Sequence, residues 1–329
     1  MKVKGLILAL LLEASAMLSP VSVSAAEPIK VRFGVDSHVF STQYWVAKEK
    51  GFFEKRGIAP EISVYSYGID TINAALLDQV DFAEGYDFAI LSRLSGGDLK
   101  IISYIQHIKA EANQVVARDG ITRPEELAGK KIGVQKATQN EYVVHKYLAR
   151  FGLEGKVTKV GFTSNPEIFA AFDRGDIQAT IFNSTFLEKA LKIKGVKVIN
   201  TQADIPHAGK GFALVTGKFH NAHPEVTRKV LEALDESTRF ILSNPKEAAD
   251  IIFKTVKIPR DVLLDDLQEK NILLDIHFTQ DEYRQLRDIG EYSVKNNLIR
   301  GGYNLDDHIL LEPLRSVLPQ KVSVVQGKK

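Results

Sequence analysis

The chain has 329 residues, with 43 Lys and Arg against 41 Asp and Glu and a formal net charge of +2. This balance gives no electrostatic reason to expect nucleic acid as a partner. The chain has no cysteine, which excludes a disulfide framework, thiol nucleophiles, thiolate metal sites and the lipid-attachment site of a lipoprotein. Because single hydrophobic cores stop growing near this chain length, we expect two lobes.

Residues 1–26 have the pattern of a secretory signal peptide. Lys2 and Lys4 precede an apolar run from Leu6 to Leu12 that is too short for a permanent membrane anchor. Small residues close the segment, and we expect signal peptidase to cleave after Ala25 or Ala26. We therefore expect a soluble, monomeric protein in the periplasm, neither lipid-anchored nor embedded in the membrane.

From residue 27, short β-branched runs alternate with amphipathic segments of helical length, and this alternation predicts a parallel sheet covered by helices. The chain changes character near residue 115, which we interpret as its crossing into a second lobe. The first series has expected strands at 29–35 and 61–65, expected helices at 42–50 and 71–78, and further units at 82–83, 88–94, 99–104 and 114–117.

A second α/β series fills residues 116–211, and residues 211–216 are expected to be the strand that returns to lobe one. The remainder from residue 223 is almost entirely helical in pattern and should pack on lobe one, which would then consist of 27–115 and 212–329. Within lobe two, helices are expected at 124–128, 139–151 and 166–173, and strands at 131–134, 157–161 and 179–182.

Four segments resemble, in order, the nitrate, sulfonate and taurine binding proteins, a family that includes binders of thiamine precursors. The most specific is WVAKEKGFFEKRGI at 45–58, followed by 80–85, 121–134 and 170–177. This resemblance implies a type II periplasmic-binding-protein fold, with two α/β lobes and the ligand in the cleft between them. It also implies the solute-binding component of an ABC importer, which closes on a small molecule and delivers it to a permease with a cytoplasmic ATPase.

Candidate ligand-binding residues lie in the loops at the carboxyl ends of the expected strands, because the crevices of α/β sheets open there. These loops are rich in aromatic and uncharged polar groups, and the aromatic side chains either stack on a planar ligand or only pack the cleft wall. The candidates are Asp36, His38, Phe40, Tyr67, Glu84 and Tyr86 from lobe one, and Thr138, Gln139, Asn140, Asn165 and Asn183 from lobe two.

Two of these candidates suggest opposite ligand charges. Glu84 could bind an amine or a ring N–H through charge-assisted hydrogen bonds, or it could be a solvated or capping acid. The helix start at Thr138 could hold an anion on its free backbone N–H groups, or Thr138 and Glu141 could simply cap the helix. Sulfonate, nitrate, an aromatic acid and an aminopyrimidine all remain open as ligands.

The sequence offers no catalytic constellation, no glycine-rich phosphate loop and no spaced metal-binding motif, so we expect no catalytic residue, no cofactor and no metal. Two alternatives to import stay open on the same fold. One is an enzyme like the thiamine-precursor synthases, although their cysteine-rich motif cannot exist in this chain. The other is a protein that senses the same ligand and reports it to a receptor.

Overall fold

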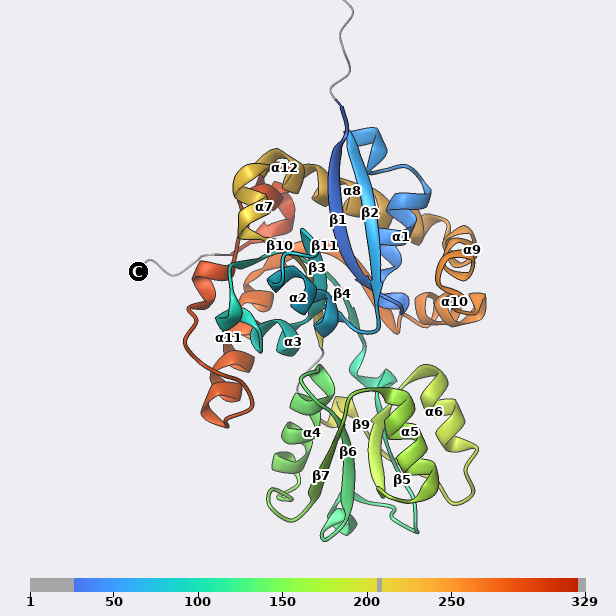
Figure 1. Ribbon diagram of the computed structural model, residues 1–329. Coiled ribbons are helices and arrows are strands. Elements are labelled where there is room, and N and C mark those ends of the chain that lie inside the picture. The colour runs from blue at the N-terminus through green and yellow to red at the C-terminus, as the bar shows by residue number, and fades with distance from the viewer. Residues whose placement is uncertain (1–26, 206–208, 325–329) are drawn as a thin grey trace, which may run out of the picture.

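The computed structural model describes residues 27–205 and 209–324, so the expected signal peptide lies outside the described residues. The described strands form two sheets, one of seven strands and one of five, and helices cover both (Figure 1). The α/β architecture expected from the sequence is therefore confirmed.

The larger sheet has the order β12-β11-β4-β10-β3-β1-β2. Its first strand, β1, pairs in parallel with β2 and β3, whereas β10 lies antiparallel between β3 and β4. Chain segments from both halves of the sequence thus share one sheet. The strands are β1 Ile29–Asp36, β2 Ile58–Tyr65, β3 Phe82–Tyr86, β4 Leu99–Ile108, β10 Lys210–Thr216, β11 Ile272–Thr279 and β12 Val322–Ser323.

The smaller sheet has the order β7-β6-β8-β5-β9, with β6 parallel to β7 and β8, and β5 antiparallel to β8 and β9. The chain changes sheet between β4 and β5 and again between β9 and β10. The boundaries expected at 115/116 and 211/212 fall a few residues beyond these connections, inside β5 and β10. The strands are β5 Gln114–Ala117, β6 Lys131–Gln135, β7 Thr158–Phe162, β8 Ala179–Phe182 and β9 Lys197–Thr201.

Helices pack beside each sheet, and none in 27–205 or 209–324 combines the length and apolar character needed to cross a bilayer. Three helices accompany the smaller sheet: α4 Gln139–Arg150, α5 Asn165–Arg174 and α6 Ser184–Leu191. The others accompany the larger sheet: α1 Thr42–Glu49, α2 Gly68–Leu76, α3 Asp87–Leu91, α7 Gly217–Ala222, α8 Pro224–Ser243, α9 Pro245–Val256, α10 Arg260–Gln268, α11 Gln280–Lys295 and α12 Glu312–Val317.

The C-terminal part is less helical than its sequence pattern indicates, because it also supplies β11 and β12. The strand β11 pairs antiparallel with β4, and its residues alternate between fully buried and partly exposed. This period of two is present in the sequence ILLDIHFT and is the signal for a half-buried strand. The C-terminal segment therefore completes the sheet as well as covering it.

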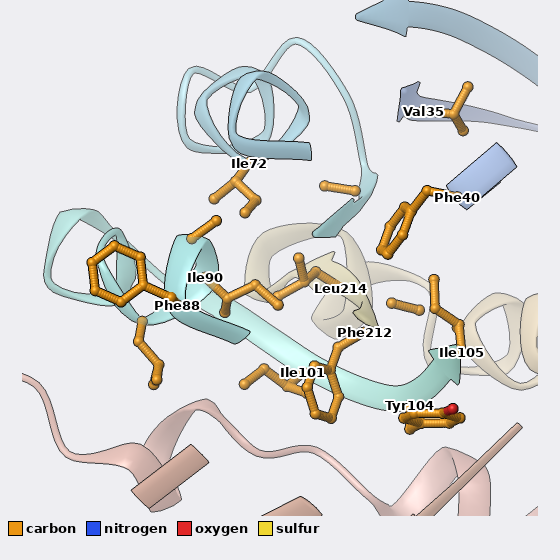
Figure 2. Close-up of a cluster of buried hydrophobic side chains, with 14 of the residues drawn as sticks. Val35, Phe40, Ile72, Phe88, Ile90, Ile101, Tyr104, Ile105, Phe212 and Leu214 are labelled. Carbon is orange, nitrogen blue, oxygen red and sulfur yellow. The ribbon is translucent and has the colours of Figure 1, made fainter. Parts of the chain in front are cut away.

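The return strand β10 lies at the centre of the main hydrophobic core. Its residues Phe212 and Leu214 are fully buried and lie in one cluster with Ile101 and Ile105 of β4 (Figure 2). A second, smaller core lies behind the five-stranded sheet and contains Phe172 and other apolar residues of that lobe. The main core also continues into the lobe of the five-stranded sheet, where it includes Val115, Ile132 and Tyr142, so the two lobes share part of their apolar packing.

Gly211, in β10, is packed directly against the ring of Phe40, and a Cβ atom there would lie 2.3 Å from Cε2 of that ring. We expect Gly211→Ala to displace the buried ring and to lower the free energy of unfolding by about 1–3 kcal/mol, the usual cost of overpacking. Urea denaturation measures this change. Gly301→Ala is the control, since Gly301 is exposed and its nearest neighbour is a flexible valine methyl at 3.3 Å. The control should change stability by less than about 0.5 kcal/mol, and equal losses in the two variants would contradict the packing argument.

Candidate functional site

A cavity of about 430 Å³ lies between the two sheets and is lined by residues from both. From the larger sheet come Asp36 at the end of β1, the loop residues that follow it, and Tyr86 at the end of β3. From the smaller sheet come the start of α4 and Phe182 at the end of β8. Its position at strand ends is the one expected for a ligand crevice in α/β sheets.

The structure brings all the sequence-predicted site residues except Glu84 to this cavity. Ligand binding by each of them stays a prediction, but their shared location supports the choice of loops. The lining candidates are Asp36, His38, Phe40, Tyr67, Tyr86, Thr138, Gln139, Asn140, Asn165 and Asn183.

Aromatic rings form much of the wall on the side of the larger sheet. The rings of Phe40 and Tyr86 lie 4.7 Å apart between centroids, and those of His38 and Tyr67 stack at 5.3 Å. The Tyr86 hydroxyl is buried and has no hydrogen-bond partner among the described residues. These rings offer a planar ligand both faces and edges against which to pack.

The start of α4 is capped from within the protein. The hydroxyl of Thr138 donates to the carbonyl of Gln135 at 2.9 Å and accepts from the backbone N–H of Asn140 at 3.2 Å. The carboxylate of Glu141 accepts from the backbone N–H of Ala137 at 2.7 Å. Capping therefore accounts for the hydroxyl of Thr138, and it places a negative side chain at a helix start that would otherwise attract an anion.

Glu84 lies behind the cavity wall, where it is completely buried. Its Oε1 accepts the backbone N–H of Asp36 at 3.0 Å and contacts the hydroxyl of Ser41, whereas its Oε2 has no partner among the described residues. Asp36 is 6% exposed and reaches the cavity itself. Of these two acids, only Asp36 therefore lines the cavity.

Burial dominates the protonation of both acids. Loss of hydration raises the pKa of Glu84 well above its usual range, and the nearby charge of Asp36 raises it further. Burial also raises the pKa of Asp36, although His38 partly opposes this through its charge and its backbone N–H. Both acids therefore hold protons more strongly in the folded chain than in water.

Two sets of contacts join the lobes around the cavity. The hydroxyl of Tyr67, which follows β2, accepts the backbone N–H of Asn165 at the start of α5 at 3.1 Å. Beside the cavity, α4 meets the larger lobe where Tyr142 packs on Phe88 and where His145 shares a 2.8 Å hydrogen bond with the hydroxyl of Tyr292. The lobes are therefore held together over the cavity by the protein's own groups.

Sequence reasoning missed part of the wall. The connection Lys257–Pro259 between α9 and α10 lines the cavity, as does Asp266 of α10, where burial raises the pKa to about 6. The left-handed φ of 62° at Lys257 and the proline that follows mark the helix end. They do not indicate that this connection reaches the cavity, and only the packing of α9 on α1 and α10 places it there.

Metal binding finds no support in the part of the chain that the structure describes, since no group of three or more His, Asp or Glu side chains there could hold an ion. The lining acids Asp36 and Asp266 are not joined into such a group. The side chains that line the cavity offer hydrogen-bonding groups, carboxyl groups and apolar surface.

Comparison with known proteins places this geometry in a family. The model of the NMT1/THI5-like family matches residues 40–248. A protein of Brucella abortus named as a binding protein is 24% identical over 245 residues, covering 73% of this chain and 75% of that protein. A protein of Bacillus subtilis named as an aliphatic sulfonates-binding protein is 25% identical over 228 residues, covering 68% of each chain.

Solved structures show the same fold at low sequence identity. The periplasmic aliphatic sulphonate binding protein SsuA from Escherichia coli superposes with a TM-score of 0.72 at 18% identity, covering 86% of this chain and 97% of that one. The desulfurization enzyme DszB superposes with a TM-score of 0.64 at 14% identity, covering 89% of this chain and 99% of the enzyme. The two-lobed periplasmic-binding-protein fold predicted from the sequence is thereby confirmed.

The buried carboxyl group of Glu84 should make the free energy of unfolding depend on pH. A carboxyl group whose pKa is raised by folding binds more protons when folded, so its contribution to stability is present at low pH and is lost as the pH rises. Glu84→Gln removes the titrating carboxyl group and therefore removes this loss of stability at higher pH. Relative to the variant, the wild type should therefore lose about 1–3 kcal/mol of unfolding free energy between about pH 4 and pH 8, the scale of an uncompensated buried polar group.

Urea denaturation across that pH range measures the difference, and Glu126→Gln is the control of opposite sign. A hydrogen bond from the backbone N–H of Thr122 lowers the pKa of Glu126. The wild type should therefore gain stability relative to that variant as the pH rises. Parallel stability curves for the wild type and Glu84→Gln would show that the Glu84 carboxyl is not perturbed by folding.

Proposed function

Because the chain belongs to the NMT1/THI5-like family, we propose that it is the solute-binding component of an ABC importer. In this proposal it captures a small organic molecule between its lobes and delivers it to a permease with a cytoplasmic ATPase. The observation that carries the proposal is the cavity between the sheets, lined from both lobes by aromatic and polar side chains. A ligand there touches both lobes and favours their closed arrangement.

We propose binding without chemistry. This is supported by relatives that are named as binding proteins. It is also supported by the cavity wall, which is lined by aromatic and polar side chains. Because a desulfurization enzyme also has this fold, the fold alone does not decide between binding and catalysis. The absence of cysteine in the sequence excludes a thiol nucleophile in any enzymatic alternative.

The proposed location is the periplasm, with the chain acting as a soluble monomer. This is supported by the signal-peptide pattern of residues 1–26 and by the periplasmic binding protein whose fold the chain shares. Delivery of ligand to a permease would place the partner surface on the rims of the two lobes, since those rims approach each other only when the cavity closes.

A ligand screen tests the proposed function. We expect at least one compound from a panel of sulfonates, nitrate, aromatic acids and aminopyrimidines to stabilise the protein. At about 100 times its dissociation constant, a ligand adds about 2.7 kcal/mol of stability, which a thermal-shift assay detects. The same compound should populate the compact form in small-angle scattering and should be recovered unchanged by NMR. Turnover would instead show an enzyme, and stabilisation by no compound at saturating concentration would contradict the proposal for these ligand classes.

The contact between Tyr67 and Asn165 predicts a specific closure defect. Tyr67→Phe removes the hydroxyl that accepts the Asn165 backbone N–H across the cavity. We expect affinity for the screened ligand to fall about threefold to tenfold, the value of one hydrogen bond, and the unliganded protein to be more expanded in scattering. Tyr147→Phe is the matched control, because that hydroxyl donates to Asn200 within the smaller lobe. An equal loss of affinity in both variants would argue against a closure contact.

A further inference from the structure

The ligand's chemistry can be inferred from the acid pair at the inner wall of the cavity. Asp36 and Glu84 lie on the neighbouring strands β1 and β3, whose parallel register pairs Phe33 with Phe82. This register brings the end of β1 beside Glu84, and the backbone N–H of Asp36 donates to Glu84 Oε1. Only Asp36 lines the cavity, so Glu84 acts from behind it.

The hydrogen bonds of Ser41 indicate that the pair holds one proton. The Ser41 oxygen already accepts the backbone N–H of Asp36 at 2.8 Å. It also lies 3.1 Å from Asp36 Oδ1 and in close contact with Glu84 Oε1. Its single hydroxyl hydrogen can be donated to only one of these carboxyl oxygens, and a proton on one of the acids satisfies the other contact. One proton shared in this way leaves one negative charge on the pair.

No lysine or arginine of the described chain neutralises that charge. Among residues 27–205 and 209–324, no lysine or arginine lies within 4.0 Å of either acid, and the half-exposed imidazole of His38 is 3.9 Å from Asp36 Oδ1. Lys257 is the one lysine or arginine in the described cavity wall, and its Nζ donates to the carbonyl of Lys254. A buried charge whose nearest cationic group is a half-exposed imidazole at 3.9 Å is poorly compensated, and Asp36 is the acid of the pair that lines the cavity.

Other groups around the pair also favour a donor or a cation. The carboxyl oxygen Glu84 Oε2 is a buried polar atom without a partner in the described structure, whereas the unpartnered Tyr86 hydroxyl can donate or accept and does not discriminate between ligands. The rings of Phe40 and Tyr86, which line the cavity beside Asp36, present π faces that attract cations. At the opposite lobe, Glu141 already occupies the start of α4, which reduces what an anion would gain there.

We propose that the ligand of this site carries a nitrogen cation, a protonated amine or an amidinium, which pairs with the carboxylate of Asp36. The ligand thus brings one positive charge to an acid pair that holds one negative charge. This inference rests on the proposed function, because it names the chemistry of the molecule that the cavity binds. Asp36 makes the contact, whereas Glu84 positions Asp36 and shares its proton.

Three probes with one ring and different head groups test the charge preference. Benzamidine is a cation, benzamide is a neutral donor, and benzenesulfonate is an anion. In calorimetry on the wild type, we expect benzamidine to bind at least about tenfold more tightly than benzamide, and benzenesulfonate to bind most weakly. A benzenesulfonate affinity equal to or above that of benzamidine overturns the inference, and so does a failure of benzamidine to bind at millimolar concentration.

Matched variants test the role of each acid. Asp36→Asn should lower benzamidine affinity by about tenfold or more and leave benzamide within about twofold, because only the charge is removed. Glu84→Gln should lower benzamidine affinity less than Asp36→Asn does, because Asp36 keeps its charge and loses only the acid that positions it. Asp173→Asn, at an exposed acid that does not line the cavity, should leave the affinities of the three probes unchanged. Equal loss of all three probes in Asp36→Asn overturns the inference.

Folding of the key variant is checked separately. Asparagine retains the oxygen that accepts the His38 backbone N–H at 2.9 Å, so Asp36→Asn should melt without ligand at or above the wild-type temperature. Failure of the proposed function and failure of the cation inference give different results in these experiments. If a sulfonate from the wider screen binds and closes the lobes, the proposed function stands and the cation inference is overturned. If no ligand of any charge binds, both are overturned.

Discussion

The structure depends on the position of one strand, β10, at the centre of the larger sheet. It hydrogen-bonds to β3 on one side and to β4 on the other, and the sheet has no direct pairing between those two strands. Because β10 follows the smaller sheet in the chain, the larger sheet is complete only after the chain has crossed to the second lobe and returned. Ala112 and Asn113 of the first connection and Gln202 at the start of the second line the cavity, so the site lies where the chain passes between the sheets.

The same strand determines the character of the cavity wall. Ala213 of β10 pairs with Glu84 of β3, which holds the acid within the sheet, and Gly211 leaves room for the ring of Phe40. An acid at such a position must be compensated, and Ser41 and the backbone N–H of Asp36 provide only part of that compensation. The wall is therefore tightly packed. The part of the acid pair's charge that these groups do not compensate lies at the cavity, where Asp36 lines the wall.

The fold itself leaves the chemistry open, as the comparison with a sulphonate binding protein and a desulfurization enzyme illustrates. The helix start that would suit an anion is capped by Thr138 and approached by Glu141, whereas the opposite wall carries a buried acid pair. Both walls therefore carry acidic groups, and both favour a cation over an anion in the cavity.

The sequence by itself determined the α/β class, the two lobes, most helices and strands, and the loops that line the cavity. These follow from local periodicity and from the rule that crevices open at strand ends. Only the tertiary structure decided which way Glu84 faces, because β3 is buried on both sides and its side-chain alternation marks no solvent face. It also decided that Lys257–Pro259 and Asp266 reach the cavity, since helix packing between distant segments leaves no local pattern in the chain.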